Sequence, residues 1–155
     1  MRIFKPYKSS KMSDTIIVEE VYNQPLEKVW AAISNPRELG KWYFDIPDFE
    51  LKPNHKFHFY EPGEEKKFLH VCEIVEIQPL NKLSYTWSYP EISKESTLVN
   101  WELETLGDQT RLVLRHEHLD HFKSLGEGFS FENFLEGWRS ILQESLKGYL
   151  DNGIL

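Results

Sequence analysis

An alternation of apolar and polar residues runs through three segments in the second half of the chain, and it constrains the fold more than any other sequence feature. In residues 82–89 the residues of one parity are large and apolar: Leu83, Tyr85, Trp87 and Tyr89. Successive side chains of a β-strand point to opposite faces, so this pattern predicts one buried face and one face in solvent. Residues 97–106 and 110–118 alternate in the same way, with a turn at Gly107-Asp108-Gln109. We expect consecutive antiparallel strands that form a meander.

A strand and a short helix are predicted near the N-terminus. Residues 15–22 are rich in β-branched residues and end at Asn23-Gln24-Pro25, which signals a turn and the start of a helix. In residues 25–34 the apolar positions have helical spacing, and Pro36 ends that helix because the residue before a proline avoids the helical conformation.

Further strands are predicted after an irregular stretch that contains Trp42, Tyr43 and Phe44. Residues 49–51 and 56–60 flank residues 52–55, which are expected to form a hairpin turn because Asn54 tolerates a positive φ. Residues 67–78 form a longer strand that Pro79 closes. Its inward face is either that of Glu73 or that of His70, and the sequence allows both.

The end of the chain, residues 133–150, is predicted to be one long amphipathic helix. At about 100° per residue, an apolar arc contains Phe131, Phe134, Leu135, Trp138, Leu142 and Tyr149. Ser145 falls inside this arc, where it either leaves space with a polar group beside it or bonds back to the carbonyl of Ile141. Gly137 and Gly148 lie at the border of the arc, and we expect a strand or loop to approach them closely, since each costs about 1 kcal/mol in a helix.

The order strand, helix, antiparallel strands, long helix predicts an α+β domain. The sequence also resembles a known family in the segments Pro25-Leu26-Glu27-Lys28-Val29-Trp30, Ile77-Gln78-Pro79, Lys82-Leu83-Ser84-Tyr85-Thr86-Trp87, Trp101-Glu102-Leu103, Thr110-Arg111-Leu112, His116, Gly137-Trp138 and Leu142. On these residues it resembles the homologues of the heat-shock-protein-ninety ATPase activator, within the START-like (SRPBCC) superfamily. The resemblance implies a helix-grip fold, in which a curved antiparallel sheet of about six or seven strands wraps a long C-terminal helix around a hydrophobic cavity. We expect a flexible basic leader over residues 1–14 and a single START-like domain over residues 15–153.

The charge of the chain narrows the choice of partner. A formal net charge of -7 disfavours nucleic acid and anionic membranes, which both attract basic surfaces. Cys72 is the only cysteine, so no internal disulfide is possible and a cytoplasmic location is expected. The chain is expected to be a monomer or a homodimer.

Two chemical patterns in the sequence are typical of metal or catalytic sites. His116 and His118 share a face if the last strand reaches His118, but a histidine pair lacks the full spacing of known metal motifs. Glu73 and His116 form an acid/base pair only if Glu73 points inward. We therefore predict no metal, no cofactor and no catalytic residue.

The favoured function is non-catalytic binding of a small hydrophobic or aromatic molecule between the sheet and the last helix, with Gly126 and Gly128 allowing the preceding loop to act as a lid. The alternatives are a chaperone-associated interaction module that uses the outer face of the sheet and a cyclase- or aromatase-like enzyme. The predicted ligand-binding residues are Phe57, Phe59, Tyr85, Trp87, Trp101, His116, Trp138, Ser145 and Tyr149.

Overall fold

A computed structural model describes residues 14–61 and 67–152. Apart from Asp14, the predicted basic leader lies outside the described residues. Six antiparallel strands form one sheet in the order β1-β6-β5-β4-β3-β2. The strands are β1 (Ile16–Tyr22), β2 (Lys56–Tyr60), β3 (Leu69–Gln78), β4 (Lys82–Ser88), β5 (Ser96–Leu106) and β6 (Gln109–Glu117). The expected meander runs from β2 to β6, and β1 pairs with β6 at the far edge.

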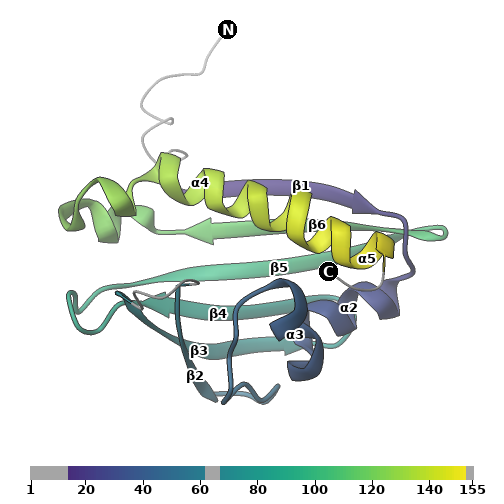
Figure 1. The fold of residues 1–155 in the computed structure, drawn as a ribbon, viewed down its shortest axis with the longest axis horizontal. Helices are drawn as coiled ribbons and strands as arrows, with labels where there is room; N and C mark the ends of the chain where they lie inside the picture. Colours follow the sequence, from purple (N-terminus) through teal and green to yellow (C-terminus); the bar gives the residue numbers. More distant parts are fainter. Residues whose placement is uncertain (1–13, 62–66, 153–155) are drawn as a thin grey trace, which may run out of the picture.

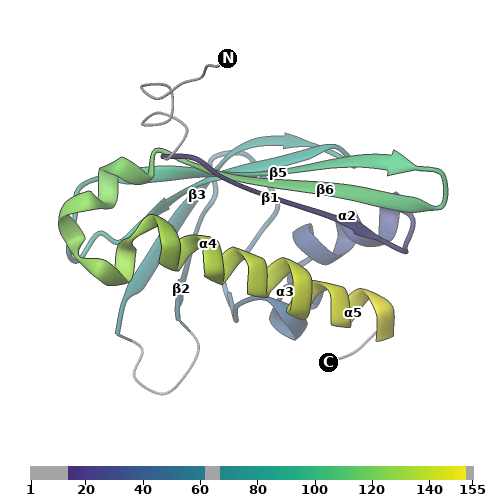
Figure 2. The same ribbon diagram turned by 90° about the horizontal axis from the view of Figure 1, so that it is seen from above.

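The helices lie on one face of the sheet. They are α2 (Leu26–Ser34), α3 (Pro36–Trp42), η1 (Leu119–Leu125), η2 (Glu127–Phe129), α4 (Phe131–Ser140), η3 (Ile141–Leu146) and α5 (Lys147–Asn152). The elements α4, η3 and α5 form one continuous helix that runs across the sheet (Figure 1). Figure 2 shows that this helix and the curved sheet form two layers. The predicted α+β helix-grip fold is confirmed.

The alternation of apolar residues positions the core between these layers. Tyr85 and Trp87 of β4 and Trp101 of β5 point toward the helix and are buried. The opposite face is not uniformly exposed as predicted, because Ser84 is 1% exposed. Its hydroxyl donates to Asn100 Oδ1 at 2.6 Å, which satisfies the buried polar group within the sheet.

Between α2 and β2 one helix was not predicted and one predicted strand is absent. Pro36 does end α2, but it also begins α3, since the side chain of Asn35 accepts a hydrogen bond from the Arg37 backbone N–H and proline fits the first turn of a helix. Residues 49–51 are not a strand: the backbone N–H of Phe49 bonds to the carbonyl of Ile46 in a local turn. Phe49 is instead buried in the core.

The last helix is not α-helical throughout, because η3 is a π-helix. A π-turn contains more residues than an α-turn, since each hydrogen bond reaches from residue i to i+5. Residues spaced by four therefore stay on one face, and those buried are Trp138, Leu142, Leu146 and Leu150. The prediction that Ser145 lies inside the buried arc assumed a uniform α-helix, and Ser145 is only half-buried.

Candidate functional site

Seven of the nine predicted ligand-binding residues gather in one aromatic cluster between the sheet and the last helix, and all seven are buried: Phe57, Phe59, Tyr85, Trp87, Trp101, His116 and Trp138. Trp138 of α4 lies at the centre, with ring centroids 5.5 Å from Trp87 and 5.7 Å from Trp101. The cluster therefore joins the helix to three neighbouring strands, β4, β5 and β6.

Hydrogen bonds fix the orientation of His116. The Trp138 indole N–H donates to His116 Nδ1 at 2.9 Å. An indole only donates, so Nδ1 is the acceptor and the ring proton lies on Nε2, which donates to Thr97 Oγ1 at 2.7 Å. Burial lowers the pKa of His116 to about 3, which keeps the ring neutral. Both ring nitrogens form hydrogen bonds within the protein, so His116 holds the Trp138 indole in its orientation.

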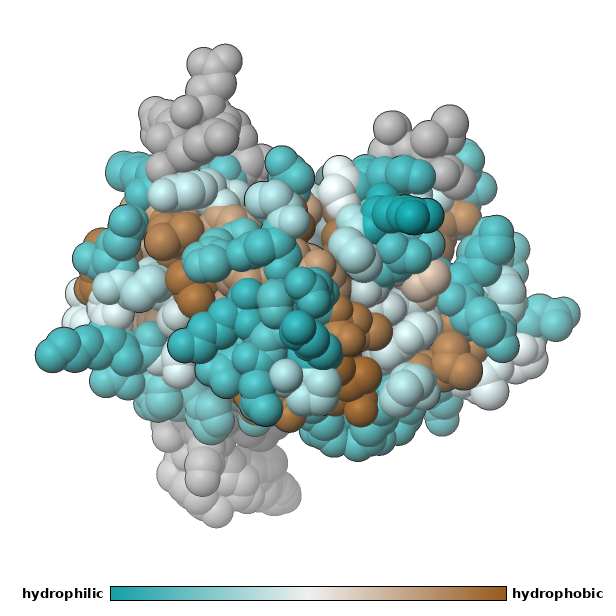
Figure 3. Space-filling model, turned by 90° about the horizontal axis from the view of Figure 1, so that it is seen from below, coloured by the Kyte–Doolittle hydropathy of each residue, from teal (hydrophilic) through white to brown (hydrophobic). Residues whose placement is uncertain are grey.

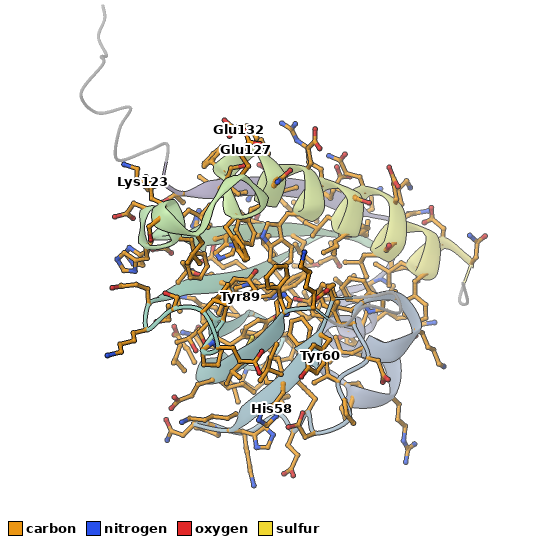
Figure 4. All side chains as sticks on the ribbon, turned by 60° about the vertical axis from the view of Figure 1, so that its left-hand side comes forward. His58, Tyr60, Tyr89, Lys123, Glu127 and Glu132 are labelled. Atoms are coloured by element: carbon orange, nitrogen blue, oxygen red, sulfur yellow. The ribbon has the colours of Figure 1, made fainter. Side chains whose placement is uncertain are left out.

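Beside this cluster, a cavity of about 190 Å³ opens between the sheet and α4. It is lined by Phe44, Glu61, His70, Trp87, Tyr89, Gly128, Asn133, Phe134, Gly137, Trp138 and Ile141. We call it the sheet–helix pocket. Gly128, Asn133 and Gly137 are exposed and form its mouth, whereas His70, Trp87 and Tyr89 are buried and form its inner wall. Figure 4 shows Tyr89 lying between the strands and the helix.

The two glycines at the mouth of the pocket, Gly128 and Gly137, have open space where a side chain would lie. A Cβ atom added at Gly137 would meet nothing within 4 Å, so within residues 14–61 and 67–152 no strand or loop approaches this glycine closely, contrary to the prediction. The missing side chain instead leaves space in the mouth of the pocket. A Cβ atom at Gly128 would also meet nothing within 4 Å. Gly126 has a φ of +108°, a backbone conformation that glycine adopts readily.

His70 is a pocket residue that the sequence left undecided. It points inward together with Cys72 and Ile74, and Glu73 points outward. The His70 ring stacks on Phe59 with centroids 4.5 Å apart. Burial lowers its pKa to about 4, although the Phe68 carbonyl that Nδ1 contacts opposes this shift. A neutral imidazole therefore belongs to the wall of the pocket.

The remaining two predicted residues lie away from this pocket. The Tyr149 hydroxyl donates to Glu38 Oε1 at 2.8 Å, and Tyr149 lines a separate hollow of about 500 Å³ beside α2 and α3. Ser145 is half-buried and is not among the residues that line the sheet–helix pocket. The change of helical repeat in η3 accounts for this, because the predicted arc combined positions on either side of it.

A larger hollow of about 550 Å³ lies at the free edge of β2. Its lining includes Tyr43 and Asp48, and His58 on the outward face of β2 pairs with Asp48. In Figure 4, His58 and Tyr60 lie on the β2 side of the molecule, apart from Tyr89.

Figure 3 views the molecule from below, where hydrophobic residues reach the surface as a narrow band between hydrophilic areas. Phe44 and Glu61 line both this hollow and the sheet–helix pocket.

The residues that suggested metal or acid/base chemistry do not converge. The strand β6 ends at Glu117, and His118 has a φ of +70°, so its side chain leaves the face of His116. Within residues 14–61 and 67–152, no three His, Cys, Asp or Glu side chains are grouped so that they could hold a metal ion. Glu73 points away from His116, which removes the proposed acid/base pair.

The sheet, the long helix and the aromatic pocket between them define a START-like helix-grip domain. The chain belongs to the family described as Activator of Hsp90 ATPase homolog 1-like protein, which matches residues 23–151. Among curated proteins, none matches the chain. In the part of the chain that the structure describes, no helix is long and apolar enough to cross a membrane.

Solved structures share the fold at low sequence identity. DynU16, from the dynemicin biosynthetic locus, is 18% identical with a TM-score of 0.74; the match covers 91% of this chain but 48% of DynU16, so this chain spans about half of that protein's length. MLL2253 from Mesorhizobium loti is 22% identical over 91% of this chain and 99% of its own, with a TM-score of 0.73. Aha1 from Colwellia psychrerythraea, solved as a dimer, is 20% identical over 90% of this chain and 97% of its own, with a TM-score of 0.71.

Proposed function

We propose that this protein binds a small aromatic molecule non-catalytically in the sheet–helix pocket. The observation that carries the proposal is a concave, largely aromatic site with few polar groups, open at a mouth where two glycines leave space. Ligand sites of proteins have this character: apolar walls supply affinity, and a few polar groups supply orientation.

The size of the pocket sets the size of the ligand. A cavity of about 150 Å³ lined by apolar side chains holds benzene, so a cavity of about 190 Å³ suits a substituted benzene. The contacting walls in this proposal are Phe44, His70, Trp87, Tyr89, Phe134, Trp138 and Ile141. The other buried members of the predicted set pack against these walls in the core and do not line the pocket: Phe57, Phe59, Tyr85, Trp101 and His116.

The alternative functions receive less support from the geometry. An outward Glu73 weakens the enzyme hypothesis, because the pocket then lacks the acid/base pair that motivated it. Charged side chains on the outer face of the sheet pair with one another, such as Arg115 with Glu102 at 3.2 Å. Such pairs leave these charges less available to a protein partner, which weakens the interaction-module hypothesis. The family description concerns a chaperone ATPase activator, and a chaperone partner stays a prediction for this chain, as does a homodimer.

The proposal is tested by blocking the mouth of the pocket without disturbing the fold. The probe is isopropylbenzene, and the readout is the NMR signals of the indole N–H groups of Trp87 and Trp138. We expect saturable shifts in the wild-type protein that Gly137→Leu abolishes, since the new side chain enters open space at the mouth. Gly40→Leu is the matched control, because Gly40 is also helical and open but does not line the pocket.

Two outcomes would refute ligand binding at this site. In the first, the wild-type protein shows no saturable shift with isopropylbenzene or with acetophenone, an aromatic ketone of nearly the same size. In the second, Gly137→Leu binds the probe as tightly as the Gly40→Leu control does.

A further inference from the structure

Tyr89 lines the sheet–helix pocket and carries a hydrogen-bond donor that no described residue accepts. The side chain is 4% exposed, and its hydroxyl oxygen accepts a hydrogen bond from Trp87 Nε1 at 2.9 Å. An indole nitrogen has no acceptor capacity, so the hydroxyl hydrogen of Tyr89 must point elsewhere. Among the residues that the structure describes, no acceptor is paired with it. Because a buried donor without a partner is costly, we expect water or a ligand to accept this hydrogen.

The charges around the pocket are one-sided. Glu61 lines it, and the two carboxylate oxygens accept the backbone N–H groups of Lys67 at 2.6 Å and Phe68 at 2.9 Å. Burial raises the pKa of Glu61, but these N–H groups outweigh burial and the pKa is lowered overall, so the carboxylate is charged at neutral pH. Among the described residues that line the pocket there is neither lysine nor arginine, and His70 is neutral. An anionic ligand would be repelled by the Glu61 carboxylate and would meet no positive side chain among these described residues.

We propose that the pocket selects uncharged aromatic molecules that carry a carbonyl-type acceptor, to which the Tyr89 hydroxyl donates, and that it rejects aromatic carboxylates. The inference rests on the proposed function and specifies the ligand class of that site. A pure hydrocarbon displaces water from Tyr89 and leaves the hydroxyl unpaired. A ketone replaces the water and restores the hydrogen bond, so it binds more tightly than a hydrocarbon of the same shape.

Three probes of nearly equal size separate these effects: isopropylbenzene, acetophenone and benzoate. In the wild-type protein we expect acetophenone to bind roughly three- to tenfold more tightly than its solvation alone predicts, which is the ordinary range for one buried hydrogen bond. The quantity compared is the affinity of acetophenone divided by that of isopropylbenzene. This ratio is expected to fall by the same factor in Tyr89→Phe. Using a ratio removes those effects of the substitution that are common to both probes.

A spectroscopic measurement keeps the test decisive if Tyr89→Phe folds poorly. The infrared carbonyl band of bound ¹³C-acetophenone is expected at the lower frequency of a hydrogen-bonded ketone in the wild-type protein. A band at the free-carbonyl frequency, or an unchanged affinity ratio in Tyr89→Phe, overturns the assignment of Tyr89 while binding of isopropylbenzene leaves the proposed function standing. Failure of all three probes to bind overturns both.

The predicted rejection of aromatic carboxylates is tested separately, with a variant of Glu61. Benzoate is expected to bind at least tenfold more weakly than acetophenone, and Glu61→Gln is expected to narrow that gap, since it removes the charge and keeps the side-chain shape. Equal affinity for benzoate and acetophenone in the wild-type protein overturns this part of the inference.

Discussion

Two buried histidines should make the protein sensitive to mild acid. Burial lowers the pKa of His116 to about 3 and that of His70 to about 4, whereas both rings titrate near 6.5 when the chain is unfolded. As the pH falls below 6.5, the unfolded chain therefore binds protons that the folded protein does not bind. The contribution of these two histidines to the free energy of unfolding is fully present above pH 6.5. It is lost progressively as the pH falls toward the pKa values of the folded protein.

The size of the loss follows from the pKa values. Each pH unit between the two pKa values is worth about 1.4 kcal/mol per histidine, so lowering the pH from 7.5 to 5.0 costs about 2 kcal/mol for each ring and about 4 kcal/mol for both. The carboxyls with lowered pKa respond mainly below their ordinary values of 3.8 to 4.5, which lie under this window: Glu19, Asp48, Glu61 and Glu76.

Urea unfolding followed by tryptophan fluorescence at several pH values measures this dependence. His116→Asn keeps an acceptor oxygen for Trp138 and removes the titrating ring, and His70→Phe keeps an aromatic ring against Phe59. Each variant should lose about half of the pH dependence between 7.5 and 5.0, and the double variant should lose nearly all of it. A free energy of unfolding that is flat over this range in the wild-type protein would refute the reasoning, as would an unaltered slope in His116→Asn.

Two further predictions concern the last helix. Tyr22→Phe removes the buried hydrogen bond at 2.7 Å from the Tyr22 hydroxyl to the Leu142 carbonyl in η3, and should lower the free energy of unfolding by about 1 kcal/mol in urea titrations; an unchanged midpoint would contradict it. Gly137→Ala should raise the melting temperature by about 2–4 °C, because alanine stabilises a helix by up to about 1 kcal/mol and its Cβ meets open space. Gly40→Ala serves as the control for helix propensity alone, and a lower melting temperature in Gly137→Ala but not in Gly40→Ala would contradict the prediction.

The strand alternation was sufficient to predict most of the fold. A period of two residues places Leu83, Tyr85 and Trp87 on one face whatever the rest of the chain does, because the pleat of a strand is a local property. The same holds for the last helix as a unit, whose apolar residues recur at nearly helical spacing. Only its π-helical segment was missed, although the spacing of four from Trp138 through Leu142 and Leu146 to Leu150 is a signal for it.

The site was harder to predict because its members come from segments without a period of their own. Residues 67–78 are apolar on both faces near His70, so the choice between His70 and Glu73 depends on pairing with β2 and β4 and not on local pattern. Phe44 follows a short helix whose start at Pro36 was itself missed. The predicted position of Tyr89 was correct, since it shares the parity of Trp87, but the sequence could not show that its hydroxyl accepts a hydrogen bond from Trp87.

Gly137 shows why the sequence could identify a residue as unusual and still assign it the wrong role. The helical angle placed this glycine at the border of the apolar arc, and a glycine there has two readings: a neighbour too close for a side chain, or a space that a side chain would fill. The helix is the same in both cases, and the difference lies in η2 and β3, which are separate in sequence. Since a Cβ at Gly137 meets nothing within 4 Å, the helix forgoes about 1 kcal/mol of propensity without gaining a packing contact. Such a loss is retained most simply where the space itself is used, which is why Gly137 is the residue to fill first.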